Sequence, residues 1–316
     1  MKQLLVLVLF CLTVKGVAQD MQVADSLQSG YVKYIFKRQV SPFSQEYADA
    51  PAFLNFNSSE TVFVAGRFGM EEKHNTGELM GDSAAIGYVG PTSSEKGFMV
   101  YRNFITKEIT YNQLKLASFP PYVVKDNWVE MKWELSEKTK VIAGYNVKKA
   151  TTIFRGTKYT VWYTDSIPLP YGPLKLFGLP GVILEATVHN VGMNGRDTTY
   201  KAFEVCYPCS NNQTIEAPVE DVVKTIEEEV LFRDNFQYYF VSESNEKFKP
   251  FGGKMFLSEL PSERAILNKR KESHEKVYEW ETKDTKRVLQ GIDYKSLLDP
   301  NKKGGEDLTL PDFSKF

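Results

Sequence analysis

The side chains able to do chemistry are sparse and widely spaced in this chain of 316 residues. His74, His189 and His274 stand far apart in the sequence, and none has a nucleophile or a second metal ligand at a motif spacing. The sequence contains no Gly-x-Ser-x-Gly turn, no His-Glu-x-x-His helix and no glycine-rich phosphate loop. We therefore expect each histidine to pack or to face solvent, and we predict no catalytic residue, no metal site and no cofactor.

Two cysteines form the next candidate site, in the run Cys206-Tyr207-Pro208-Cys209. The same spacing occurs in thioredoxin-like redox sites, where a helix N-terminus lowers the pKa of the first cysteine. Here serine, two asparagines and a glutamine follow at 210–213, which favours a turn, and no βαβ pattern flanks the pair. We predict a local structural disulfide, with a redox-active pair and free thiols as the alternatives.

The N-terminus has the pattern of an export signal. Lys2 precedes an apolar run at 4–14, and Ala18 ends a stretch of small residues suited to cleavage. The run is shorter than the ~20 residues that a membrane span needs. We predict a signal peptide at 1–18 and an exported protein, in which an oxidising compartment permits the disulfide; a buried N-terminal strand is the alternative.

Composition and charge describe an ordinary folded protein. Hydrophobic residues make up 42% of the chain, charged residues 25%, and the formal net charge is −1. Near-neutral charge argues against a strongly cationic nucleic-acid binder, so we predict no nucleic-acid partner. No segment after the signal is apolar enough to be a transmembrane helix.

Hydrophobic periodicity predicts the elements that must position any site. Short runs rich in β-formers, such as 31–38, 128–135 and 139–164, alternate with turn residues and indicate an antiparallel sheet or open barrel. An apolar stripe over 219–230 predicts a late helix, and the charged segment 262–289 predicts a second one at the surface.

We therefore expect a mainly β fold, a β-rich α+β protein with one or two late helices. A single domain is predicted over 19–300, followed by a flexible C-terminal tail at 301–316, where charge and glycine replace apolar periodicity.

The segment between Ile142 and Ala186 holds the densest pattern. Within it, Leu179-Pro180-Gly181-Val182 predicts a type II turn, in which proline presets one φ and glycine accepts the positive φ that follows. This turn is either a rigid corner of the fold or one rim of a concave face that holds a ligand or a partner. A cation near aromatic rings would either bind a carboxylate or stack on a ring. The candidate binding residues are Arg155, Trp162, Tyr163, Phe177, Leu179, Pro180 and Gly181.

This block resembles the GLPGLI family, exported proteins of the Bacteroidota. The resemblance covers about 45 residues and is weaker over 31–63. The family often has a cysteine where this chain has Val147, so a disulfide built on it is absent and Cys206–Cys209 is a separate solution. The matching features are Gly144-Tyr145, Lys149-Ala150, Phe154-Arg155-Gly156, Trp162-Tyr163-Thr164, Ile167-Pro168, Gly172-Pro173 and the name motif Gly178-Leu179-Pro180-Gly181-Val182-Ile183.

The resemblance implies more than the residue pattern does. The family is related to the bowl-shaped N-terminal domain of a bacterial peptide N-glycanase, which implies curved antiparallel sheets forming an open bowl or half-barrel. Its genes often neighbour TonB-dependent outer-membrane receptors, which implies a receptor partner and a periplasmic or outer-membrane-associated place. Asp82-Ser83-Ala84 resembles a Bacteroidota O-glycosylation acceptor, which makes Ser83 a candidate modification site.

Together these observations predict a non-enzymatic envelope protein. It would bind a peptide, a glycan, an apolar ligand or a TonB-dependent receptor through a concave β surface near the loop at 178–183. The alternatives are a hydrolase acting on peptides or glycans and a carrier of an apolar or lipid ligand, because linear sequence does not reveal which side chains converge.

Overall fold

The computed structural model describes residues 29–39, 47–66, 97–113, 119–189, 197–209, 215–257, 277–280, 289 and 294–297. The predicted signal peptide at 1–18, the tail at 301–316, Ser83, His74 and His274 lie outside these residues, as does most of the surface helix predicted at 262–289. The chain divides into two compact units, Met1–Val223 and Lys224–Phe316, where the sequence predicts one domain over 19–300.

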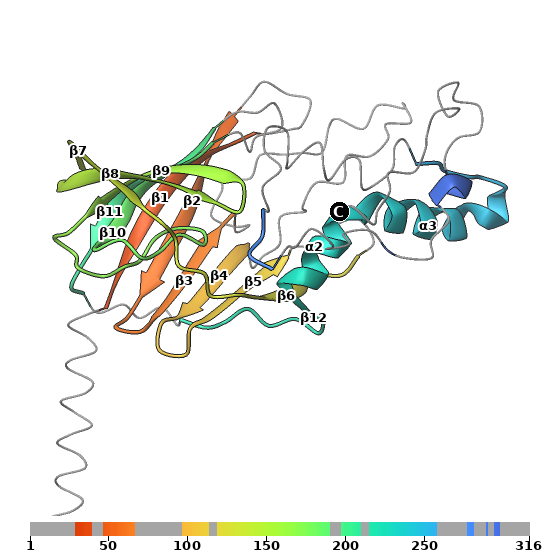
Figure 1. The fold of residues 1–316 in the computed structure, drawn as a ribbon, viewed down its shortest axis with the longest axis horizontal. Helices are drawn as coiled ribbons and strands as arrows, with labels where there is room; N and C mark the ends of the chain where they lie inside the picture. Colours follow the sequence, from red (N-terminus) through yellow and green to blue (C-terminus); the bar gives the residue numbers. More distant parts are fainter. Residues whose placement is uncertain are drawn as a thin grey trace, which may run out of the picture. The chain divides into compact units, whose positions relative to one another are not determined.

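The first unit is built from an antiparallel sheet, which confirms the mainly β prediction (Figure 1). The strand order is β12-β6-β5-β4-β3-β2-β1-β11-β10-β9-β8-β7, so most neighbours along the sequence are also neighbours in the sheet. The strands are β1 (Gly30–Gln39), β2 (Tyr47–Phe56), β3 (Glu60–Ala65), β4 (Phe98–Asn103), β5 (Glu108–Gln113), β6 (Tyr122–Asp126), β7 (Glu134–Ile142), β8 (Tyr145–Phe154), β9 (Thr157–Thr164), β10 (Val182–Val188), β11 (Thr198–Cys206) and β12 (Val223–Thr225).

Tight hairpins set the register of the strands. The β7–β8 turn places Ala143 and Gly144 at φ +48 and +85, and the β8–β9 turn places Arg155 and Gly156 at φ +47 and +75. Two successive positive φ values are those of a type I′ turn, whose twist matches that of the strands it joins. Between β2 and β3, Asn57 Oδ1 instead accepts the backbone N–H groups of Ser59 and Glu60 at 2.9 and 2.7 Å.

The sheet is strongly curled, as an ion pair across its concave side shows. Seven strands separate β6 from β9 in the sheet order. In a flat sheet these two strands would lie about 38 Å apart, at roughly 4.8 Å per step. Yet Asp126 at the end of β6 and Arg155 in the β8–β9 turn approach to 2.8 Å. The predicted open bowl or half-barrel is therefore confirmed.

The inner side of this curl carries the core. Alternate residues of β1, β2, β3 and β4 point to it. Several of these side chains have no exposed surface, including Tyr34, Leu54, Phe63 and Val100. Since successive residues of a strand face opposite sides, the same strands present a second set of side chains outward.

The second unit contains the two late helices, α2 (Ile226–Asp234) and α3 (Phe236–Phe248), followed by the short 3-10 turns η1 (Lys249–Phe251) and η2 (Tyr294–Leu297). Helix α2 begins at a capping box: the Glu228 N–H donates to Thr225 Oγ1 at 3.2 Å, and Glu228 Oε2 accepts the Thr225 N–H at 2.8 Å. The predicted start near Val219 is therefore wrong, because the cap lies at Thr225 and the preceding residues are extended or coil.

A small core holds the second unit together. Val241, Leu257 and Tyr294 are buried, and Tyr294 donates its hydroxyl hydrogen to Asn235 Oδ1 at 2.9 Å. In the described part of the chain, no helix has the length and apolar character needed to cross a membrane.

Candidate functional site

The loop between β9 and β10, residues 165–181, carries four of the seven predicted binding residues, and its backbone follows a fixed course. Within it, the Tyr171 N–H donates to Leu169 O at 2.8 Å, and the Gly178 N–H donates to Pro170 O at 3.0 Å. Its far end is tied back as well, since the Ile183 N–H donates to Tyr171 O at 2.9 Å. Bonds of this kind leave the loop little freedom, as its prolines and glycines predict.

The two glycines of the motif are needed for different reasons. Gly178 has φ +93, which favours glycine, whereas Gly181 does not have a positive φ. The predicted type II turn at Pro180-Gly181 is therefore wrong. A Cβ at Gly181 would lie 1.9 Å from Thr164 O, so glycine is required there because two backbone segments meet without space for a side chain.

A buried arginine donates hydrogen bonds to the backbone of the loop. Arg102, on β4, has no exposed surface. Its Nη1 donates to Leu176 O at 2.9 Å, its Nη2 to Gly172 O at 2.6 Å, and its Nε to Thr61 Oγ1 at 3.1 Å. Burial lowers its pKa to about 10, so the guanidinium remains protonated at neutral pH. This cation thus satisfies two loop carbonyls.

Three more side-chain hydrogen bonds connect the loop to the rest of the fold. The Tyr34 hydroxyl donates to Ile183 O at 2.6 Å, and burial raises the pKa of this phenol. The Trp133 indole donates to Phe177 O at 3.0 Å, and the Tyr171 hydroxyl donates to Ser58 O at 3.0 Å. The loop is therefore fixed to β1, to the segment before β7 and to the β2–β3 turn.

Three charged side chains, Asp126, Arg155 and Lys175, form a cluster on the concave side of the sheet. Arg155 Nη1 lies 2.8 and 3.0 Å from the two carboxylate oxygens of Asp126, and Lys175 Nζ lies 2.7 Å from Asp126 Oδ2. The Asp126 side chain is 2% exposed and that of Arg155 is 9% exposed. The Arg155 guanidinium also lies 4.9 Å from the Phe154 ring centre. Both predicted roles, carboxylate binding and ring stacking, are thus met by partners in the chain itself.

The predicted apolar residues pack into the fold. Tyr163, Phe177 and Leu179 are only 2–4% exposed. Leu179 and Leu176 form one core cluster with Ala150, Val161, Tyr163, Ile183 and Ala186, contributed by β8, β9 and β10. Phe177 packs against Trp128, with 4.6 Å between the ring centres and an angle of 44° between the ring planes. The loop therefore covers the inner face of these three strands with its own side chains.

Trp162 lies on the other face of the sheet. Its neighbours Val161 and Tyr163 point inward, and it pairs in register with Lys149 on β8 and Glu185 on β10. Lys140 Nζ lies 4.2 Å from the Trp162 ring centre and 2.6 Å from Glu185 Oε1. The structure therefore does not bring Trp162 together with Phe177 and Leu179; of the predicted motif residues, Pro180 is the exposed one.

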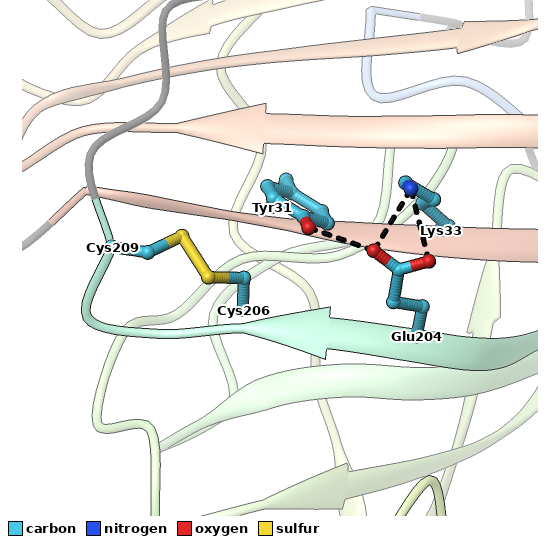
Figure 2. Close-up of a disulfide and its surroundings, with 5 residues drawn as sticks. All are labelled: Tyr31, Lys33, Glu204, Cys206 and Cys209. Carbon is cyan, nitrogen blue, oxygen red and sulfur yellow. Dashed lines mark hydrogen bonds and ion pairs between the residues drawn. A yellow bond between two sulfur atoms is a disulfide. The ribbon is translucent and has the colours of Figure 1, made fainter.

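The two cysteines are joined by a disulfide just after β11 (Figure 2). The Cys209 N–H donates to Ser29 O at 3.0 Å, next to the start of β1. Beside it, Glu204 accepts from the Tyr31 hydroxyl at 2.7 Å and from Lys33 Nζ at 2.9 Å. These two donors lower the pKa of the Glu204 carboxyl, and the hydrogen bond to Glu204 raises the pKa of Tyr31.

Comparison with known families gives one sequence match. Residues 105–202 match the family described as the N-terminal domain of N-glycanase peptide. This segment of the chain is therefore related to the N-terminal domain of the F-II type of peptide N-glycanase, as the sequence resemblance predicts. The match includes the loop, Arg155 and Asp126, whereas Cys206 and Cys209 follow it. No curated protein sequence matches the chain.

Three solved structures show weaker likeness. PNGF-II shares 17% identity at a TM-score of 0.41 over 64% of this chain, and the match spans 32% of PNGF-II. The MucA/MucB complex of Pseudomonas aeruginosa shares 13% at 0.25, covering 62% and 55% of the two chains. A LolA superfamily protein of Nitrosomonas europaea shares 7% at 0.26, covering 60% and 90%. At these values the likenesses carry no argument about function.

Sequence reasoning missed two features that the structure reveals. Arg102 was detectable only as an arginine two residues after the core residue Val100, on the inward side of a strand. His189, predicted to be isolated, lies 2.8 Å from Thr160 Oγ1 and 2.7 Å from Asp197 Oδ2. Among the described residues, no three His, Cys, Asp or Glu side chains converge as metal ligands.

Proposed function

We propose that this chain is an exported envelope protein of the GLPGLI type that docks an outer-membrane partner through the exposed corner of the loop at 165–181. A TonB-dependent receptor is the partner that the sequence resemblance favours. The protein would lie in the periplasm or against the outer membrane, after removal of residues 1–18.

One observation carries this proposal: hydrogen bonds from the fold fix the backbone of the loop, while part of the loop surface is exposed to solvent. Arg102, Tyr34 and Trp133 fix its backbone from the protein side. Pro180 and Gly178 of the same loop are exposed. A rigid corner loses little conformational entropy when a partner binds it, so the same contacts give a higher affinity than on a flexible loop.

Side chains of the loop fill the concave interior, so we do not propose a ligand site there. Leu176, Phe177 and Leu179 occupy the inner face over β8, β9 and β10, where a carrier of an apolar molecule would hold its cargo. The proposed contact is therefore made by the outer surface of the loop and not by the concave interior below it.

Photo-crosslinking in native envelopes tests the docking. A photoreactive amino acid placed at Pro180 is expected to capture an outer-membrane protein, which mass spectrometry would identify. The matched control carries the same group at Pro120, which is also an exposed proline but precedes β6. Equal capture at both positions, or capture at neither, would contradict the proposal.

N-terminal sequencing of the exported protein tests the predicted removal of residues 1–18, and the sequence should begin at Gln19.

A further inference from the structure

Three polar side chains from separate strands meet on the outer face of the sheet. Thr160 lies within β9, His189 directly follows β10, and Asp197 directly precedes β11. Thr160 Oγ1 is 2.8 Å from His189 Nε2, and His189 Nδ1 is 2.7 Å from Asp197 Oδ2. The order of the three groups is therefore hydroxyl, imidazole, carboxylate.

The partners determine which ring nitrogen carries the hydrogen. A carboxylate only accepts hydrogen bonds, so Nδ1 of the neutral imidazole must be the donor to Asp197. Nε2 then has a free lone pair and accepts the hydrogen of the Thr160 hydroxyl. This is the arrangement in which a base activates a nucleophile while a third group orients the base.

The constellation is open to solvent on the side opposite the loop. The His189 side chain is 25% exposed and that of Asp197 is 47% exposed. Thr160 points outward, because its neighbours Val161 and Tyr159 face the core cluster on the inner side. A small molecule can therefore approach Thr160 without displacing the loop at 165–181.

We propose that Thr160, His189 and Asp197 form an acyl-transfer site. Thr160 Oγ1 attacks the carbonyl carbon of an ester and its proton passes to His189 Nε2. The bond from that carbon to the leaving oxygen then breaks, and the Nε2 proton goes to the leaving group. Water, deprotonated by His189, hydrolyses the acyl-threonine and releases the carboxylic acid. Asp197 is a positioning residue that holds the imidazole.

The sheet limits the substrates that such a site accepts. The strand containing Thr160 pairs with β8 on one side and β10 on the other, so its backbone N–H groups are used in the sheet and do not form an oxyanion hole. General-base activation without that stabilisation contributes about 10²- to 10⁴-fold. We therefore assign the site to acyl compounds with good leaving groups, such as aryl esters and thioesters.

The experiment uses the full chain with p-nitrophenyl acetate. We expect a burst of nitrophenolate that approaches one equivalent, and a peptide containing Thr160 that gains one acetyl group. Thr160→Val and His189→Asn should each lower the burst rate by about 100-fold. Thr160→Ser, which keeps a hydroxyl, should retain the burst within roughly threefold.

The matched control is Thr199→Val. Thr199 lies on the same face, where its hydroxyl is 2.9 Å from that of Thr187 on the neighbouring strand. This variant should change the burst rate by less than about twofold, because the hydroxyl it removes does not take part in the proposed relay. Circular dichroism of each variant establishes that it is folded.

Asp197→Asn tests the positioning role through the pH dependence. An asparagine amide can donate to Nδ1, which moves the ring hydrogen to Nε2 and blocks the base. The variant rate should follow hydroxide and rise about tenfold per pH unit, whereas the wild-type rate should depend less steeply on pH. Absence of a burst in the wild type, or acetylation that persists in folded Thr160→Val, would overturn the proposal.

Discussion

The two faces of the sheet use their polar groups in opposite ways. On the inner side, Arg102 and Tyr34 direct their hydrogen bonds at loop carbonyls, and the Asp126 carboxylate is shared by Arg155 and Lys175. On the outer side, the hydroxyl, imidazole and carboxylate of the proposed relay bond one another while solvent reaches them. Buried polar groups paired within the chain stabilise the fold, whereas the exposed set has reactive atoms that a substrate can contact.

Most of the predicted binding residues are buried by contacts within the chain, and their role in binding stays a prediction. Arg155, Tyr163, Phe177, Leu179 and Gly181 were selected because their types could bind a ligand, and all of them lie within the internal packing. Their place in the segment 105–202, the part related to the glycanase N-terminal domain, is explained by how the fold is held together. Thr160, the proposed nucleophile, lies three residues before Tyr163 on the same strand and on the opposite face.

The largest effect is expected at Gly181. Gly181→Ala would place a methyl group 1.9 Å from Thr164 O, so the two backbone segments must separate. We expect a loss of about 3 kcal/mol or more in the free energy of unfolding, measured in urea. Gly144→Ala is the control, because φ is +85 there but no atom lies within 4 Å. It should cost only about 1 kcal/mol. Similar losses at both sites would show that the corner is not tightly packed.

Removing the buried arginine comes next. Arg102→Met should leave Leu176 O and Gly172 O without donors and lower the free energy of unfolding by about 2–4 kcal/mol. Hydrogen exchange should accelerate at Gly178 and Ile183, whose N–H groups bond within the loop.

The control for Arg102 is Lys37→Met, which breaks an exposed ion pair with Asp49. It should change the stability by no more than about 0.5 kcal/mol. If the exchange rates at 165–181 were unchanged in Arg102→Met, the arginine would not be what fixes the loop.

A smaller effect is expected at alkaline pH from Tyr200, which stacks on Phe36 and contacts Phe63 on the inner side. Burial raises its pKa to about 12 from the ordinary value of 10.0. Because the folded-state pKa is higher, its contribution is fully present below pH 10 and is lost as pH rises towards 12.

Tyr200→Phe removes this contribution. The variant should therefore lose less stability than the wild type between pH 10 and 12, by up to about 1.4 kcal/mol per pH unit. Denaturant titrations at a series of pH values measure the difference. If the free energy of unfolding changed equally with pH in the two proteins, the Tyr200 hydroxyl would be hydrated in the folded state, which would contradict this prediction.

The smallest stability effect is expected on the outer face. Thr160→Val removes one half-exposed hydrogen bond, so the free energy of unfolding should fall by only about 0.5–1.5 kcal/mol. The same substitution is expected to lower the burst rate by about 100-fold, which would separate a functional group from a structural one. A loss as large as that of Arg102→Met would make Thr160 part of the supporting structure and weaken the contrast between the faces.

Local patterns predicted local features well. Runs of β-forming residues predicted the strands at 31–38 and 139–164, whereas the strand predicted at 128–135 is wrong, because residues 127–133 are coil and β7 begins at Glu134. Gly144 and Gly156 allow the hairpins that join β7, β8 and β9. The predictions failed where a distant contact decides the outcome. Gly181 is required by Thr164 O, and not by its own φ as the Pro-Gly turn suggested. Helix α2 starts at the Thr225 cap, and not at the start of the valine stripe.

Sequence alone determined the β-rich character of the first unit, the presence of late helices and the stiffness of the loop, because these depend on preferences of neighbouring residues. The partners of Arg102, Asp126 and His189 were decided only by strand pairing and by the curl of the sheet. Arg155 and Asp126 are 29 residues apart in the chain, as are Thr160 and His189. Such pairs leave no periodic signal in the sequence, since strand pairing and curvature bring them within hydrogen-bond distance only after folding.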